Sequence, residues 1–111
     1  MSATERDKPL KGLSDLDAID AAFTALAHPA RRHILQVLWA SHGGMTAGEL
    51  SSRFSHSWPT TTRHLNVLLG AGLVSVHTEG RQRHYRIERQ TLGEVIALWV
   101  RSIGFDLVDA T

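Results

Sequence analysis

The spacing of apolar residues changes twice along this chain, and these changes limit the possible fold more than any other feature. Up to Leu69, apolar side chains recur every three or four residues, which is the repeat of an α-helix with one buried face. Between residues 73 and 87 the pattern changes to alternation and β-branched residues, which is typical of strands. From Thr91 onward the helical repeat returns. We therefore expect a mainly α-helical chain with one β-hairpin before its last helix (α+β).

Capping and helix-breaking residues divide the helical part of the chain into four predicted helices. Ser14 is the candidate N-cap of the first helix. This helix ends before His28 and Pro29, because proline fits the first turn of a helix but not its interior. The second helix is predicted over residues 29–41 and stops at two consecutive glycines. Its expected inward side chains are Ile34, Leu35, Leu38 and Trp39.

Two further helix starts are marked by hydroxyl residues. Thr46 is followed three residues later by Glu49, which is the capping-box pattern, and it opens a short helix over residues 47–54. Ser57 is the N-cap candidate of the next helix, which extends to about Leu69 before a Gly-Ala-Gly sequence ends it. Two such helices joined by a few residues predict a helix-turn-helix.

A β-hairpin and a last helix complete the predicted order, ααααββα. Strands are expected over residues 73–77 and 82–87 with a turn over 78–81, so that the hairpin forms the wing of a winged helix-turn-helix. The last helix, over residues 91–103, is apolar on nearly all sides, which indicates packing partners on more than one face. The apolar stripes of the first and last helices are Leu16, Ile19, Phe23 and Leu26, and Leu92, Val95, Ile96, Trp99 and Ile103.

Length and composition limit the number of domains and the chemistry. A chain of 111 residues forms one domain, expected over residues 14–104 between a polar arm (1–13) and a C-terminal tail (105–111). Cysteine is absent, which excludes disulfides and thiolate chemistry. Without a P-loop, G-x-S-x-G or H-E-x-x-H motif, we expect neither an enzyme nor a cofactor. Without a long apolar run or secretory signal, we expect no membrane contact and a cytoplasmic location.

The net charge of +1 hides an uneven distribution along the chain. Residues 1–20 and 91–111 are each net −2, whereas residues 21–90 carry eight arginines, three glutamates and all seven histidines. A basic centre between acidic ends indicates a polyanionic partner for one face, and the alternative is a solvated basic surface.

The helix that follows Ser57 has the features of a reader of double-stranded DNA. Its inward side chains are Thr61, Leu65, Leu68 and Leu69, and its outward ones are Pro59, Thr62, Arg63 and Asn66. Residues 55–78 contain no acidic side chain and no lysine, whereas ordinary solvated helices carry both. We expect Arg63 to bind a guanine edge and Asn66 an adenine edge in the major groove, with Ser57 and Thr60 near a phosphate. The alternative is an amphipathic helix with a polar outer face.

The predicted wing adds a second basic surface. Arg81 and Arg83 flank the turn at Gly80, and we expect them to contact phosphates or to enter the minor groove. The alternative is a charged edge strand that resists pairing with another chain. Arg86 and Arg89 are weaker candidates for DNA contact.

Five motifs in a fixed order resemble one family of regulators. They are AHPARRHIL at residues 27–35, TAGEL at 46–50, SWPTTTRHLNVL at 57–68, AGLV at 71–74 and EGRQRHYRI at 79–87. Over about residues 16–103, the chain resembles the arsenic-repressor (ArsR/SmtB-type) family of winged-helix transcription regulators.

The resemblance implies an intracellular prokaryotic repressor that occupies an inverted repeat as a homodimer. The family's base-reading positions fall on Trp58, Pro59, Thr62 and Arg63. Trp58 is expected either to contact a thymine methyl group or a sugar, or to pack against the protein. The interface implied by the resemblance joins the first and last helices through Leu16, Ile19, Phe23, Val95, Ile96, Trp99 and Ile103.

The chain departs from the metal-binding members of this family. Their Cys-x-Cys pair falls on Thr46 and Gly48 here, and no histidine follows His84 to supply a ligand on the last helix. We therefore expect no metal sensing by either route, and the sequence identifies no effector. Two alternatives stay open: a repressor that responds to metal through its histidines, and a winged-helix module that binds a protein instead of DNA.

Overall fold

The structure is a computed structural model that describes residues 13–107. The predicted arm, apart from Leu13, and the last four residues of the predicted tail lie outside the described residues. The elements are α2 (Leu13–Leu26), α3 (Pro29–Ser41), α4 (Ala47–Arg53), α5 (Trp58–Gly70), β1 (Val74–Glu79), β2 (Gln82–Ile87) and α6 (Arg89–Ser102). This order confirms the predicted series of four helices, a hairpin and a final helix.

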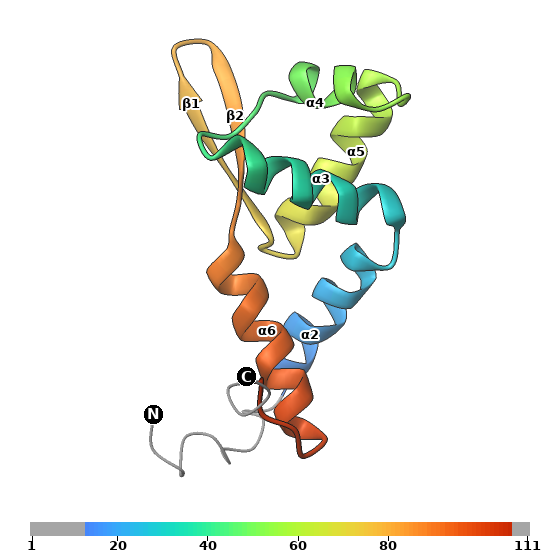
Figure 1. Cartoon of the computed structure of the whole chain (residues 1–111), viewed down its shortest axis with the longest axis vertical. Helices are drawn as coiled ribbons and strands as arrows, with labels where there is room; N and C mark the ends of the chain where they lie inside the picture. The colour runs from blue at the N-terminus through green and yellow to red at the C-terminus, as the bar shows by residue number, and fades with distance from the viewer. Residues whose placement is uncertain (1–12, 108–111) are drawn as a thin grey trace.

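The elements are arranged around two ends of the molecule. The hairpin projects at one end, next to α4, while α2 and α6 pack against each other at the opposite end (Figure 1). The helix α3 connects these ends, since it contacts α2, α5 and β2. Among the described residues, no helix combines the length and the apolar character that a membrane span requires.

Hydroxyl caps start two helices as predicted. At α4, Glu49 N donates to Thr46 Oγ1 (3.1 Å) and Thr46 N donates to Glu49 Oε1 (3.0 Å), which completes the capping box. At α5, Ser57 Oγ accepts a hydrogen bond from Thr60 N at 3.3 Å. These bonds satisfy backbone donors that a helix leaves open at its start. The helix-turn-helix is therefore held in place at both of its helix starts.

Several predicted boundaries are wrong by one or two residues: α4 ends at Arg53 instead of residue 54, and β1 begins at Val74 instead of residue 73. The helix α2 already begins at Leu13, so Ser14 lies inside its first turn and is not the N-cap. The helix α6 begins at Arg89, two residues before Thr91, and ends at Ser102. Ile103 therefore follows the helix instead of closing its apolar stripe.

The hairpin is tighter than predicted. Its two antiparallel strands are joined by Gly80 and Arg81 alone, so Thr78 and Glu79 belong to β1 and pair with β2. Gly80 has a φ of +63°, a left-handed conformation that suits glycine at the first central position of a two-residue hairpin turn. The short turn places Arg81 at the tip of the wing.

The core lies where α2, α3, α4, α5 and the base of the hairpin meet, and Val95 of α6 also belongs to it. Tyr85 N donates to Met45 O (2.7 Å) and Met45 N donates to Tyr85 O (3.0 Å), so the wing is attached to the connection between α3 and α4. The prediction that Trp39 points inward is wrong, because 47% of its surface is exposed and the Arg89 guanidinium lies 4.4 Å from its ring centroid. The fully buried apolar side chains include Ile34, Leu38, Leu50, Leu65, Leu68 and Leu73.

Candidate nucleic-acid interface

The helix α5 separates its side chains into a buried and an exposed face. The buried face consists of Thr61, His64, Leu65 and Leu68. On the opposite face Trp58, Pro59, Arg63 and Asn66 are exposed, and Thr62 is half-buried. The predicted reading surface is therefore accessible, with Arg63 as its only charged residue. Leu69, which was predicted to be inward, is half-buried.

The first turn of α5 has a side-chain cap at Ser57, and it lacks one backbone N–H because its second residue is Pro59. The Oγ of Ser57 accepts from Thr60 N and donates to Thr60 Oγ1 at 3.0 Å. The hydroxyl of Thr61 donates to Ser57 O at 3.1 Å. Pro59 has no N–H, so one backbone donor is lost at the end of the helix that favours anions. The cap uses part of the hydrogen-bonding capacity of Ser57 and Thr60, and the Ser57 side chain remains exposed.

Trp58 packs against the protein and is exposed as well. A Cβ atom built on Gly48 would lie 2.9 Å from the indole Cη2 atom, so the ring rests on the backbone of α4 at this glycine. The residue nevertheless keeps 61% of its surface exposed. Of the two predicted positions for Trp58, packing on the protein is present, and it leaves a large part of the residue free at the same face as Arg63.

The wing and α5 share one groove. It has a volume of about 380 Å³ and is lined by Thr46, Ala47, Trp58, Thr62, Arg81, Gln82, Arg83 and Tyr85. Four of the predicted DNA-contacting residues, two from α5 and two from the wing, therefore line the same groove. The guanidinium of Arg83 lies 5.8 Å from the centroid of the Tyr85 ring, which supports it at the wall of the groove.

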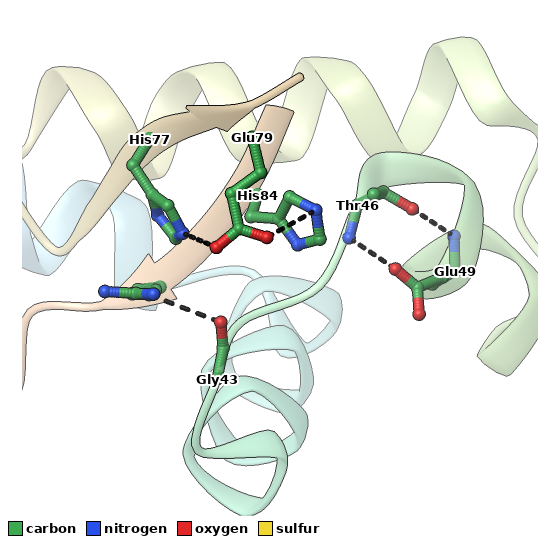
Figure 2. A network of polar contacts seen from close by, with 7 residues as sticks. Gly43, Thr46, Glu49, His77, Glu79 and His84 are labelled. Carbon is green, nitrogen blue, oxygen red and sulfur yellow. Dashed lines mark hydrogen bonds and ion pairs between the residues drawn. The ribbon is translucent and has the colours of Figure 1, made fainter. Parts of the chain in front are cut away.

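Side-chain contacts link the two strands of the wing, and one contact joins the wing to the loop after α3 (Figure 2). Glu79 lies between two imidazoles, with His77 Nε2 at 3.5 Å and His84 Nε2 at 3.8 Å, and each contact becomes an ion pair when the imidazole is protonated. Arg86 Nε donates to Gly43 O at 3.3 Å. Arg86, a weaker candidate for DNA contact, therefore attaches the wing to the loop after α3.

The capping box at α4 has an electrostatic consequence. The backbone N–H and the hydroxyl of Thr46 lower the pKa of the Glu49 carboxyl group, because hydrogen bonds from both stabilise its charged form. The start of α4 is thus held by a carboxylate at neutral pH.

A buried histidine on the inner face of α5 is the feature that sequence reasoning missed. His64 accepts a hydrogen bond from Arg31 Nη1 at its Nδ1 atom (3.3 Å), and its ring centroid lies 4.6 Å from that of His28 and 5.8 Å from that of His56. Burial lowers the pKa of the His64 imidazole, and the neighbouring His28 and Arg31 lower it further. The signal was present in the sequence, because His64 follows Thr61 by three residues on the inward stripe.

In this cluster, one ring nitrogen of each of two imidazoles is already engaged by the protein. The Nδ1 of His28 accepts from Ala30 N at 3.2 Å, and the Nδ1 of His64 is occupied by a cationic guanidinium. Within residues 13–107, no group of three or more His, Asp or Glu side chains is arranged to hold a metal ion.

The opposite end of the molecule leaves apolar side chains exposed. Phe23 is 37% exposed although its ring lies 6.0 Å from that of Trp99, and Leu16 and Ile103 are exposed as well. Ile96 and Trp99 are half-buried. Ile19 and Val95 are buried within the single chain and leave little surface for a second copy. Phe105 and Leu107, which sequence reasoning assigned to the tail, add to the exposed apolar surface.

Known proteins are similar to this chain in sequence and in fold. A family model described as a helix-turn-helix domain matches residues 26–77. The transcriptional repressor SdpR of Bacillus subtilis is 36% identical over 74 residues, which cover 67% of this chain and 80% of the repressor.

Solved structures agree with this comparison. An ArsR-like transcriptional regulator from Rhodococcus sp. RHA1 superposes with a TM-score of 0.72 at 27% identity, covering 80% of this chain and 82% of the regulator. The homodimeric winged helix-turn-helix DNA-binding domain of a possible ArsR-family regulator from Mycobacterium bovis superposes with a TM-score of 0.63 at 26% identity, covering 82% and 88% of the two chains.

Proposed function

This chain belongs to the ArsR-type family of winged helix-turn-helix transcriptional regulators, and on that premise we propose that it is a homodimeric repressor of an inverted-repeat operator. The observation that carries the proposal is the surface formed by α5 and the wing. Its outward side chains include no acidic residue between positions 55 and 78, and arginines flank it on the wing. Carboxylates would repel phosphates, and the α5 part of this surface lacks them, while the exposed Glu79 carboxylate of the wing lies within 3.8 Å of two imidazoles.

The two parts of this surface have different roles in the proposal. Arg63 and Asn66 read base edges in the major groove, because their side chains are exposed on the outer face of α5 and match guanine and adenine in hydrogen-bonding pattern. Trp58, Pro59 and Thr62 contact the bases or sugars beside them. The remaining contacts go to phosphates, which set the position of the protein on the duplex without reading sequence. They come from Ser57, Thr60, Arg81 and Arg83.

Dimer formation is proposed at the end formed by α2 and α6. The exposed apolar side chains there support it, and the Mycobacterium bovis relative is itself a homodimer. A two-fold axis would set two α5 helices about one helical turn of DNA apart, roughly 34–36 Å. The dimer would then cover promoter DNA that polymerase needs, which makes repression steric. Such a regulator works where the chromosome is, in the cytoplasm.

Metal sensing through the cysteine positions of the family is not part of this proposal. Thr46 is engaged in the capping box, and the space beside Gly48 is filled by the Trp58 indole. A cysteine side chain at position 48 would collide with that ring. The repressor is therefore expected to bind its operator in the presence of a metal chelator.

A binding experiment with the upstream region of the chain's own gene tests the proposal. We expect a labelled duplex of this region to be bound in preference to a scrambled duplex, with an affinity that falls steeply between about 50 and about 200 mM salt, because phosphate contacts release counterions. Fluorescence anisotropy measures both quantities. A protein that ignores every duplex in dilute buffer, or that binds with no dependence on salt, contradicts the proposal and favours a protein-binding module.

A further inference from the structure

A second groove lies apart from α5 and the wing tip. It is formed by the end of α2, one face of α3, the last residue of β2 and the start of α6, and its volume is about 410 Å³. Ligand pockets for small molecules begin at about 300 Å³, so this groove has the size for a small organic molecule. Its lining residues are Leu26, Arg32, Leu35, Gln36, Trp39, Ile87, Arg89 and Leu92.

The floor of this groove is apolar. Leu35 is buried, and Leu26, Ile87 and Leu92 are half-buried, so that aliphatic side chains from four elements face one hollow. Trp39 stands at the edge with nearly half of its surface exposed. Covering an exposed indole and its aliphatic neighbours with an apolar group removes apolar surface from water, which favours binding.

The rim of the groove is positive. Arg32 and Arg89 are its only charged side chains, and none of the eight described residues that line it is acidic. Arg32 Nη1 donates to Leu26 O at 2.7 Å, which holds the guanidinium at the rim while its other N–H groups remain for a further acceptor. The guanidinium of Arg89 lies over the Trp39 ring. Both cations are thus oriented by the protein before any ligand arrives.

We propose that this groove binds a small amphipathic organic anion, with its carboxylate at the positive rim to which Arg32 and Arg89 contribute and its apolar part on Trp39 and the aliphatic floor. The charge of the rim selects an anion over a neutral or cationic molecule of the same shape. Planar guanidinium groups match a carboxylate through paired hydrogen bonds.

The site also offers a route to regulation, which rests on the proposed function. Leu92 belongs to α6, and Leu26 is the last residue of α2, so the ligand contacts both helices of the proposed dimer interface. A molecule seated between α3 and α6 changes how these two helices pack. Bound ligand is therefore expected to alter the affinity of the dimer for its operator.

Calorimetric titration of the purified full-length chain with sodium decanoate, without DNA, tests the site. We expect saturable binding of one decanoate per chain, and binding of decanol, which has the same chain without the charge, at least about tenfold weaker. Arg89→Gln and Arg32→Gln should each weaken decanoate binding by about tenfold. Arg53→Gln, which removes an exposed arginine of α4 outside the groove, should leave it unchanged. Circular dichroism checks that each variant is folded.

Several results overturn the proposal. One is equal binding of decanol and decanoate, and another is full decanoate affinity in both groove variants. A third is no decanoate binding together with loss of the dimer in Trp39→Ala, which assigns the groove to a second copy of the chain. If the protein binds decanoate but no duplex, the ligand site is supported and the proposed repressor function is refuted. If it binds a duplex but no decanoate, the repressor function is supported and the ligand site is refuted.

Discussion

Apart from Trp58, the wing end of the molecule buries its large apolar side chains within one chain, whereas the end formed by α2 and α6 leaves several exposed. At the wing end, Leu50, Leu65 and Leu68 are fully buried, and the exposed residues of α5 and the wing tip are mainly polar or cationic. At the other end, Phe23 and Ile103 remain exposed although they belong to, or directly follow, helices with apolar stripes. The end formed by α2 and α6 is therefore the one where we propose that a second copy of the chain binds.

Because of this difference, we expect sequence recognition to depend on α5 and overall DNA affinity to depend on the end formed by α2 and α6. One α5 helix presents a single half-site reader, with Arg63 as its only exposed cation. Joining two readers through the incomplete end makes the second contact intramolecular, which raises the overall affinity without any new type of contact. Changes at the α2–α6 end should therefore have larger effects on DNA affinity than changes at the reading surface itself.

The largest expected effect comes from placing a charge in the exposed apolar surface. Phe23→Asp should give a monomer, because a carboxylate would be buried without a partner in the dimer. Affinity for a two-half-site duplex should fall by about 10²–10⁴-fold. Sedimentation velocity measures the oligomeric state and anisotropy measures the affinity.

Two further variants make this prediction specific. Leu16→Asp should have the same effect without touching the contact between the Phe23 and Trp99 rings. Ser52→Asp adds the same charge to an exposed position of α4 and should leave the dimer intact. If both α2 variants remain dimers, the assignment of the interface to α2 and α6 is wrong.

The next effect concerns base reading. Arg63→Ala should cost about 1–3 kcal/mol of binding free energy on the operator and much less on a scrambled duplex, because a bidentate contact to guanine carries sequence information. Competition experiments with single-base variants of the operator should show that preference is lost at one position per half-site. A uniform loss on all duplexes would identify Arg63 as a phosphate contact.

A smaller effect is expected at the tip of the wing. Arg81→Ala should weaken binding to every duplex by about three- to tenfold and reduce the salt slope by about 1, because it removes one phosphate contact. Titrations at four salt concentrations give the slope. Arg53→Ala is the matched control, since this arginine is exposed on α4 and lines neither groove. A change in sequence preference without a change in slope would show that Arg81 reads bases.

Local signals were sufficient to predict the helix-turn-helix and the wing. Three helix starts depend only on residues that are neighbours in sequence: Pro29 of α3, the capping box at Thr46 and the N-cap at Ser57. Each start can therefore be predicted from a few consecutive residues. The exposure of Arg63 followed from the helical period of α5 alone.

Contacts between distant segments could not be predicted in this way. Trp39 lies on the apolar stripe of α3, yet Arg89, fifty residues later, lies over its ring at the rim of a groove. Ile19 and Phe23 belong to one stripe, but only the structure separates the side chain buried within the chain from the one left for a partner. An apolar stripe predicts that one face of a helix is covered, but it does not predict which surface covers it.

The smallest expected effect concerns the buried imidazole of His64 on the inner face of α5, and it is a dependence of the free energy of unfolding on pH. Burial, with His28 and Arg31 nearby, lowers the pKa of His64 in the folded chain, whereas the unfolded chain retains a value near 6.5. The unfolded chain therefore binds a proton first as the pH falls, and the free energy of unfolding decreases below about pH 6.5. For one group the loss between pH 7 and pH 6 is at most about 0.7 kcal/mol.

Urea titrations at fixed protein concentration should show a shallower pH dependence for His64→Gln than for the unchanged chain. An unaltered slope in His64→Gln would mean that the buried imidazole does not couple folding to pH.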